Sequence, residues 1–140
     1  MRFLIIDDEK NIRDTMRVVL EAVGHETEGV ADGDAAVEEL SKRHFDVAFL
    51  DLKLRRENGL EVLPKLRKSA PHLDVIICSA HGSIEAAVEA MRGGAAGFIE
   101  KPFTPERLRQ VVDQVKQGRD RKSTRLNSSH GGISRMPSSA

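Results

Sequence analysis

The hydrophobic positions between residues 1 and 118 switch repeatedly between short apolar runs and segments with helical spacing. This alternation is typical of chains in which strands and helices follow one another. The apolar runs predict five strands, which are RFLII, HETEGV, DVAFL, DVIIC and GFIE. Three of them, around residues 4–6, 47–50 and 75–78, are almost continuously apolar, as expected for parallel strands covered on both faces. HETEGV is polar, and we expect it at an edge of the sheet.

Five segments with one apolar face predict helices between and after these strands. Gly24 is expected to end the first helix, and Asp32 to cap the start of the second. The third carries an internal proline, Pro64, which removes a backbone donor. Thr104 and Pro105 provide the cap and the first turn of the fifth.

The fourth helix is expected over residues 83–92. Its inward-facing residues are expected to be Ile84, Ala87, Val88 and Met91. Strands and helices that alternate in this way predict an α/β fold, a three-layer sandwich around a central five-stranded parallel sheet, because parallel strands need crossover helices. Ligand sites in such sheets form at the carboxyl ends of the strands.

Length and composition describe one ordinary globular domain. The chain has 140 residues, 39% of them hydrophobic, and no apolar run approaches the roughly 20 residues that span a bilayer. The N-terminus has no secretory leader pattern, so we expect a cytoplasmic protein without a membrane anchor. The single cysteine, Cys78, lies in an apolar run and excludes an internal disulfide.

The net charge of zero hides two different segments. Residues 1–118 carry a net charge of −4, and residues 119–140 carry +4. The second segment is rich in serine and has only scattered apolar residues, so we expect a disordered linker or sequence from a cloning vector. We therefore place the folded domain at residues 1–118. The tail has neither aromatic residues nor a helical pattern, and we expect no direct binding of nucleic acid.

Acidic and basic residues follow the predicted strands. The first strand leads into Asp7 and Asp8, the third ends in Asp51, and Lys101 closes the fifth. Three clustered carboxylates repel one another by several kcal/mol unless they are compensated. A divalent cation and Lys101 would compensate them, and an all-oxygen ligand set favours Mg²⁺ or Mn²⁺ over zinc.

This combination suits phosphoryl transfer. A metal beside an exposed carboxylate, with a lysine and a hydroxyl nearby, stabilises the charge of a transferring phosphoryl group. Asp51 is then the nucleophile and forms an acyl phosphate, and Ser79 after the fourth strand provides the hydroxyl. An ionised carboxylate needs no general base.

These residues resemble the receiver domain of bacterial two-component response regulators. The resemblance rests on five features in order, which are IIDDE, VAFLDLKL, a glycine (Gly59) eight residues beyond Asp51, CSAHG and GFIEKPF. The stretch GFIEKPFTPERLRQVV looks most like the receivers of nitrogen-regulatory transcriptional activators. The resemblance implies the flavodoxin-like (βα)₅ arrangement and a signalling phosphoacceptor that catalyses only its own phosphorylation and dephosphorylation.

The resemblance also implies roles for single residues. Asp51 would accept the phosphoryl group from a sensor histidine kinase. Asp7, Asp8, Asp51 and the backbone carbonyl of Lys53 would bind the metal. Ser79 and Lys101 would hold phosphoryl oxygens, and Lys101 would precede a cis proline, Pro102.

A switch and an output surface follow from the same resemblance. Phosphorylation would draw Ser79 inward, and the aromatic side chain of Phe98 would move into the space that it leaves. The face formed by the fourth helix, the fifth strand and the fifth helix would then change its partner, and receivers of this family often form homodimers through it. Arg55 stands where the family often has proline, so Arg55 and Arg56 would meet a docking kinase or phosphatase.

Three alternatives stay open on the sequence alone. A phosphohydrolase that forms an aspartyl phosphate usually needs a second aspartate two residues after its nucleophile, and here that residue is Lys53. A nucleotide-binding module would need a glycine-rich phosphate loop, and no such motif follows the first strand. A phosphorylation-independent interaction domain is the third.

Overall fold

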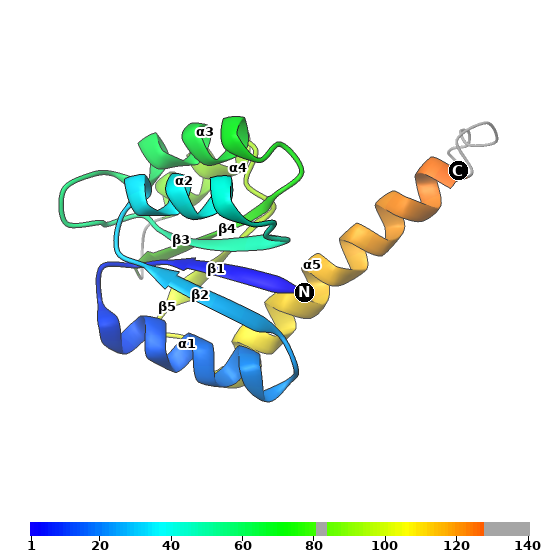
Figure 1. Ribbon diagram of the computed structural model, residues 1–140, viewed down its shortest axis with the longest axis horizontal. Helices are drawn as coiled ribbons and strands as arrows, with labels where there is room; N and C mark the ends of the chain where they lie inside the picture. Colours follow the sequence, from blue (N-terminus) through cyan, green and yellow to red (C-terminus); the bar gives the residue numbers. More distant parts are fainter. Residues whose placement is uncertain (81–83, 128–140) are drawn as a thin grey trace.

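The protein folds as a five-stranded parallel sheet between two layers of helices (Figure 1). The computed structural model describes the backbone of residues 1–80 and 84–127, and the side chains of residues 1–80 and 84–119. Its elements follow one another as β1 (Arg2–Ile6), α1 (Lys10–Ala22), β2 (Glu26–Val30), α2 (Gly33–Lys42), β3 (Val47–Asp51), α3 (Gly59–Ser69), β4 (Asp74–Ala80), α4 (Ile84–Arg92), β5 (Gly97–Lys101) and α5 (Pro105–Asn127).

The strand order in the sheet is β2-β1-β3-β4-β5. β2, the polar strand, lies at one edge as predicted, and β1, β3 and β4 lie inside the sheet. Helices α1 and α5 cover one face of the sheet, and α2, α3 and α4 cover the other (Figure 1). The predicted three-layer α/β sandwich is therefore confirmed.

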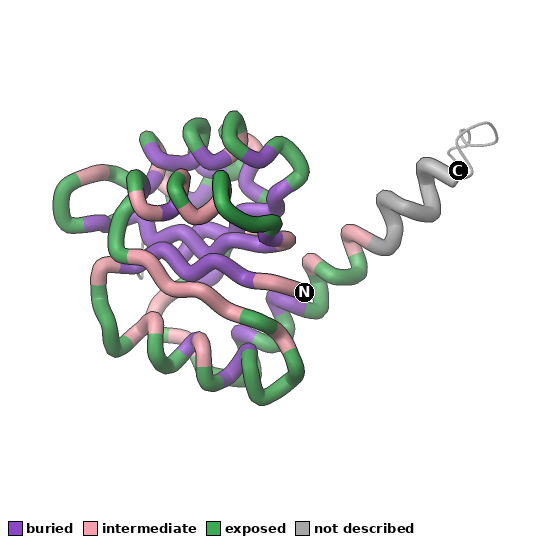
Figure 2. The backbone as a smooth tube through the Cα atoms, in the orientation of Figure 1, coloured by how far each residue is buried: buried purple, intermediate pink, exposed green. Residues whose placement is uncertain are grey.

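Alternate side chains of the inner strands pack into two separate hydrophobic cores, one on each face of the sheet. In β1, Leu4 and Ile6 belong to the core under α2 and α3, and Phe3 and Ile5 belong to the core under α1 and α5. All four side chains are almost completely buried. Figure 2 shows this burial along the centre of the sheet. The apolar runs are continuous because each strand has no solvent-facing side.

Side-chain caps start the helices where the sequence predicts them. Asp32 accepts a hydrogen bond from the amide of Ala35 at the start of α2. Thr104 accepts one from the amide of Arg107 at the start of α5. Gly24, just after α1, has a φ of +92°, a conformation that glycine adopts without strain.

The predicted inward face of α4 is wrong at three of its four positions. The side chains of Ile84, Val88 and Met91 are 71%, 47% and 44% exposed, whereas Ala87 and Ala90 are buried. Small alanines let the helix lie close to the core beside α3, and this close approach leaves the larger residues on the outside. The expected first residue, Ser83, lies outside the described residues.

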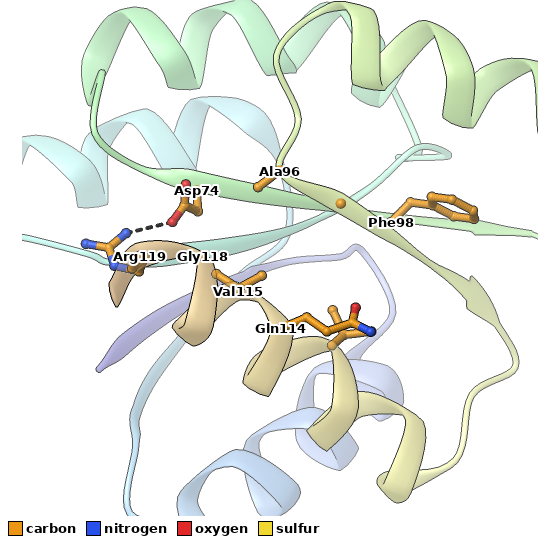
Figure 3. A pocket seen from close by; sticks show the side chains of 9 residues that line it. Asp74, Ala96, Phe98, Gln114, Val115, Gly118 and Arg119 are labelled. Carbon is orange, nitrogen blue, oxygen red and sulfur yellow. Dashed lines mark hydrogen bonds and ion pairs between the residues drawn. The ribbon is translucent and has the colours of Figure 1, made fainter. Parts of the chain in front are cut away.

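Helix α5 runs past Gly118, where we expected the folded domain to end. Residues 119–127 continue this helix, although we expected a disordered tail from residue 119, and the domain boundary stays a prediction. Extending an existing helix costs much less than starting one, so a segment that follows a helix can continue it. Arg119 also bonds Asp74 at the amino-terminal end of the sheet (Figure 3), and it bonds Asp46 there as well. Residues 128–140 of the predicted tail lie outside the described residues.

Among the described residues, no helix combines the length and the apolar character that a bilayer crossing requires.

Candidate functional site

Three aspartates meet at the carboxyl ends of β1 and β3. Asp7 and Asp8 follow β1 directly, and Asp51 ends β3. The two strands are paired neighbours whose last registered residues are Ile6 and Leu50, so their ends are level. One carboxylate oxygen from each aspartate lies within 4.8 Å of the others. The sheet topology thus brings together the three carboxylates that the sequence analysis singled out.

Lys101 reaches this cluster from the end of β5, two strands away from β3. Its ammonium Nζ lies 2.9 Å from Asp7 Oδ2 and 3.2 Å from Asp51 Oδ2. The Lys101 side chain is only 19% exposed. The lysine therefore bridges two of the carboxylates and offsets part of their mutual repulsion.

Backbone groups hold the carboxylates in place. The amide of Glu9 donates to Asp7 Oδ1 at 2.8 Å, and the amide of Lys53 donates to Asp51 Oδ1 at 3.2 Å. Arg13 donates to the carbonyl oxygen of Asp7 at 2.6 Å and fixes the turn after β1. The sequence pattern does not indicate a role for Arg13, because its contact with Asp7 depends on the position of α1 relative to the turn after β1.

Burial and charge shift the pKa values of two groups in the cluster. Burial raises the pKa of Asp51, the neighbouring charge of Asp7 raises it further, and Lys101 opposes both. Burial alone would lower the pKa of Lys101, but the hydrogen bond to Asp7 and the charges of Asp51 and Asp7 raise it above its ordinary value. Lys101 therefore stays protonated, and Asp51 is a desolvated, poorly compensated carboxylate.

Ser79 lies on β4, the strand beside Asp51, and Phe98 lies on the next strand, β5. In the pairing of β3 with β4, Asp51 is level with Cys78, and Ser79 follows at the next position. Ser79 is buried. Phe98 is 44% exposed and borders a hollow between β5 and α5 (Figure 3). The aromatic side chain is thus turned out of the core.

The donor set fits a hard divalent cation. The three carboxylates offer only oxygen atoms, which Mg²⁺ and Mn²⁺ prefer. Asp8 is half-buried and has no hydrogen bond or ion pair within the part of the chain that the structure describes. A buried acidic cluster with one uncommitted carboxylate leaves room for such an ion, and Asp7, Asp8 and Asp51 would hold it.

The loop from β3 to α3 is closely attached to the cluster. Gly59 donates its amide to the carbonyl oxygen of Leu52 at 2.8 Å, and Lys53 forms a bridge with Asn58. Glu57 accepts a hydrogen bond from the amide of Gly33 at the start of α2. The sequence analysis gave Glu57 no role, since this bond joins residues 24 positions apart.

The family model of the response regulator receiver domain matches residues 3–113. The chain belongs to this family. Receiver domains are the signalling domains of two-component response regulators, bind Mg²⁺ in an acidic pocket and interact with histidine kinases. In this receiver domain, Asp7, Asp8 and Asp51 form an acidic cluster.

Full-length transcriptional regulators are among the relatives of this receiver domain. It is 40% identical over 108 residues to the alginate biosynthesis transcriptional regulatory protein AlgB of Pseudomonas aeruginosa, covering 77% of this chain and 24% of AlgB. It is 38% identical over 114 residues to the nitrogen assimilation regulatory protein NtrX of Azorhizobium caulinodans, covering 80% of this chain and 25% of NtrX. The chain thus spans about a quarter of the length of these relatives.

A solved structure agrees with this assignment. The receiver domain of NtrX from Brucella abortus matches with a TM-score of 0.77 and 42% identity, over 80% of this chain and 95% of that domain. The predicted resemblance to receivers, including those of nitrogen regulators, is confirmed, and so is the flavodoxin-like fold. The cis peptide bond that the resemblance implied is also present, between Lys101 and Pro102.

Proposed function

We propose that this receiver domain takes a phosphoryl group from a phosphohistidine of a sensor histidine kinase onto Asp51, in a reaction that depends on Mg²⁺ or Mn²⁺. The observation that carries the proposal is the convergence of Asp7, Asp8 and Asp51 with Lys101 at one sheet edge. Asp51 is the one of the three carboxylates that belongs to a strand, and the ammonium of Lys101 lies 3.2 Å from it. It is a largely buried carboxylate held beside a cation at the sheet edge, which suits it to be the acceptor.

The transfer balances without a general base. A carboxylate oxygen of Asp51 attacks phosphorus, the bond between phosphorus and the histidine nitrogen breaks, and the imidazole leaves with that electron pair. The ammonium group of Lys101 would form an ion pair with one phosphoryl oxygen, and the hydroxyl of Ser79 would donate a hydrogen bond to another. Asp7, Asp8, Asp51 and the backbone carbonyl of Lys53 would hold a divalent ion, which when bound would supply charge neutralisation to the transferring group. Slow self-catalysed dephosphorylation would reset the domain.

The output would be a change on the face made by α4, β5 and α5. Apolar side chains already lie exposed there, which are Ile84, Val88, Met91 and Phe98. If Ser79 moves toward the phosphoryl group, it leaves space beside β4. The side chain of Phe98 would then turn inward and fill that space. Phosphate would then shift the balance between two conformations by its different affinity for them.

The chemistry of this face supports a protein partner, including a second copy of the domain, rather than nucleic acid. Full regulators such as AlgB and NtrX carry further segments beyond the matched length. A cytoplasmic location would suit a partner of a sensor kinase, and the proposed receiver domain spans residues 1–118.

Beryllofluoride, which mimics a phosphoryl group on aspartate, tests the proposal. With Mg²⁺, we expect NMR shift changes at the sheet edge and on the α4, β5 and α5 face. Asp51→Asn should abolish these changes, whereas Asp34→Asn, an exposed site on α2, should leave them intact. Equal responses of both variants would overturn the assignment of Asp51. Steady release of phosphate from phosphomonoesters would point to a hydrolase instead.

A further inference from the structure

Two arginines lie beside the acidic cluster, on the loop between β3 and α3. Arg55 and Arg56 are both exposed. Together with Leu54, Ala31 and two carboxylate residues, Asp8 and Asp32, they line one hollow. Asp8 belongs to the metal-binding cluster, so the hollow borders the reaction site.

The loop is anchored on both sides of the arginines. Leu54 is buried in the core under α2 and α3. Glu57 is held by the amide of Gly33, and Asn58 caps α3 through the amide of Leu60. Arg55 and Arg56 therefore stand at a fixed tip, which lowers the entropy cost of presenting two charges to a ligand.

Neither arginine has a committed partner. Within the described side chains, Arg55 and Arg56 take part in no ion pair and no hydrogen bond, although Asp8 and Asp32 share their hollow. Asp32 already accepts a hydrogen bond from the amide of Ala35. Asp8 would be neutralised by a bound divalent ion. Once that ion is in place, the two guanidinium groups outweigh the remaining carboxylate of Asp32 among the residues that line the hollow, which is then positive on balance.

We infer that Arg55 and Arg56 form a receiving site for a small anionic phosphoryl donor, of the acyl phosphate class, and raise the rate at which it reaches Asp51. The inference rests on the proposed function of Asp51. With a divalent ion bound, the three carboxylates and Lys101 carry no net charge together, so the cluster adds little long-range attraction for a dianion that approaches from solvent. The arginines supply the missing attraction, and guanidinium groups bind phosphate oxygens in pairs.

The step that the arginines assist is a balanced transfer. A carboxylate oxygen of Asp51 attacks the phosphorus of acetyl phosphate, the bond from phosphorus to the acyl oxygen breaks, and acetate leaves with the electron pair. No proton has to move. The arginines act on the encounter with the donor and do not touch the reacting bond, so they are specificity residues rather than catalytic ones.

The second-order rate constant for phosphorylation by acetyl phosphate, measured by intact mass with saturating Mg²⁺, tests the inference. The variants are Arg55→Ala with Arg56→Ala, and the charge reversal of both to Glu. The matched control is Lys65→Ala with Lys68→Ala, which removes the same charge from exposed sites on α3.

At low salt we expect the alanine pair to slow phosphorylation about 3-fold to 10-fold, the glutamate pair to slow it more, and the lysine control to change little. The differences should vanish near 1 M salt, where charges are screened within about 3 Å. Beryllofluoride should still saturate all the variants, which shows that Asp51 and its metal site are intact.

Equal rates for the arginine and lysine pairs at every salt concentration would overturn the inference. So would slower transfer from a kinase without any change toward acetyl phosphate, because the loop would then recognise a protein. If the unaltered protein is not phosphorylated at all, the proposed function itself fails, and the two failures are thus distinguishable.

Discussion

Gly59 lies directly against the backbone of Asp51. A Cβ atom built on Gly59 would come 2.5 Å from the carbonyl oxygen of Asp51 and 2.7 Å from the Cα of Leu52. Both contacts are with backbone, which cannot move aside as a flexible side chain can. The glycine thus lets the start of α3 close over the end of β3 and sets the path of the loop beside the acidic cluster.

Gly59→Ala should therefore lower the free energy of unfolding by about 2 kcal/mol or more, because the loop or the strand end must shift. It should also slow phosphorylation of Asp51. Gly118→Ala is the matched control, since no atom lies within 4 Å of a Cβ there and the site is inside α5. Alanine should stabilise that helix by about 0.5–1 kcal/mol. Urea unfolding of both variants checks this, and equal stability changes would contradict the packing argument.

Lys101 should stabilise the folded domain, because it compensates two carboxylates of the cluster. Lys101→Met leaves Asp7 and Asp51 without their shared ammonium, and we expect the free energy of unfolding without divalent ions to fall on the order of 1–3 kcal/mol. Mg²⁺ should restore part of the loss, because it replaces the missing positive charge. Urea unfolding with and without MgCl₂ measures both effects, with Lys68→Met as the exposed control. An unchanged stability in the absence of Mg²⁺ would show that the ion pairs contribute nothing.

Asp51→Asn should raise the free energy of unfolding in the absence of divalent ions. Burial and the charge of Asp7 raise the pKa of Asp51 above its ordinary value of 3.8. The folded state therefore binds the proton more tightly than the unfolded state, and stability is lost as the pH rises through the raised pKa. At pH 7 without divalent ions, Asp51→Asn should be more stable than the unaltered protein, and the gain should shrink as the pH falls toward the ordinary pKa of 3.8.

Thermal unfolding of Asp51→Asn and of the unaltered protein across this pH range provides the measurement. Asp34→Asn controls for the loss of an exposed charge. A variant that is less stable at pH 7, or a gain that does not depend on pH, would contradict the electrostatic reason. Addition of Mg²⁺ should reverse the order of the two proteins, since Asp51 is one of the proposed ligands.

Arg119 should tie α5 to the amino-terminal end of the sheet. It lies 2.8 Å from Asp74 Oδ2 (Figure 3). It also lies 3.4 Å from Asp46 Oδ1, and both carboxylates are largely shielded from solvent. Arg119→Ala should cost about 1 kcal/mol and speed amide exchange in the last described turns of α5. Arg109→Ala, whose partner Glu106 is exposed and 3.9 Å away, should have little effect. Unchanged exchange at residues near 119 would contradict this role.

The sequence predicted the parts of the fold that local patterns determine. Continuous apolar runs identified β1, β3 and β4, since each strand is covered on both faces, and the polar run identified the edge strand β2. The acidic cluster was predictable because parallel strands all end at one edge, so the residues that follow them had to meet there. Asp32 and Thr104 were predictable as caps because their bonds stay within one turn.

The remaining features depend on contacts between segments that are far apart in the sequence. In α4, the larger side chains of Ile84, Val88 and Met91 gave the stronger apolar pattern, yet the close approach to the core selects the small Ala87 and Ala90. The helical extension of α5 is secured at Arg119 by Asp74, 45 positions away. Only the three-dimensional arrangement of the elements decides such contacts.

The most direct test of the central claim is the mass of the protein after incubation with acetyl phosphate and MgCl₂, followed by mapping of the modified peptide. We expect one added phosphoryl group, located on the peptide that contains Asp51. It should be absent from Asp51→Asn and from the unaltered protein in EDTA. The same incorporation in Asp51→Asn, or without a divalent ion, would contradict the account.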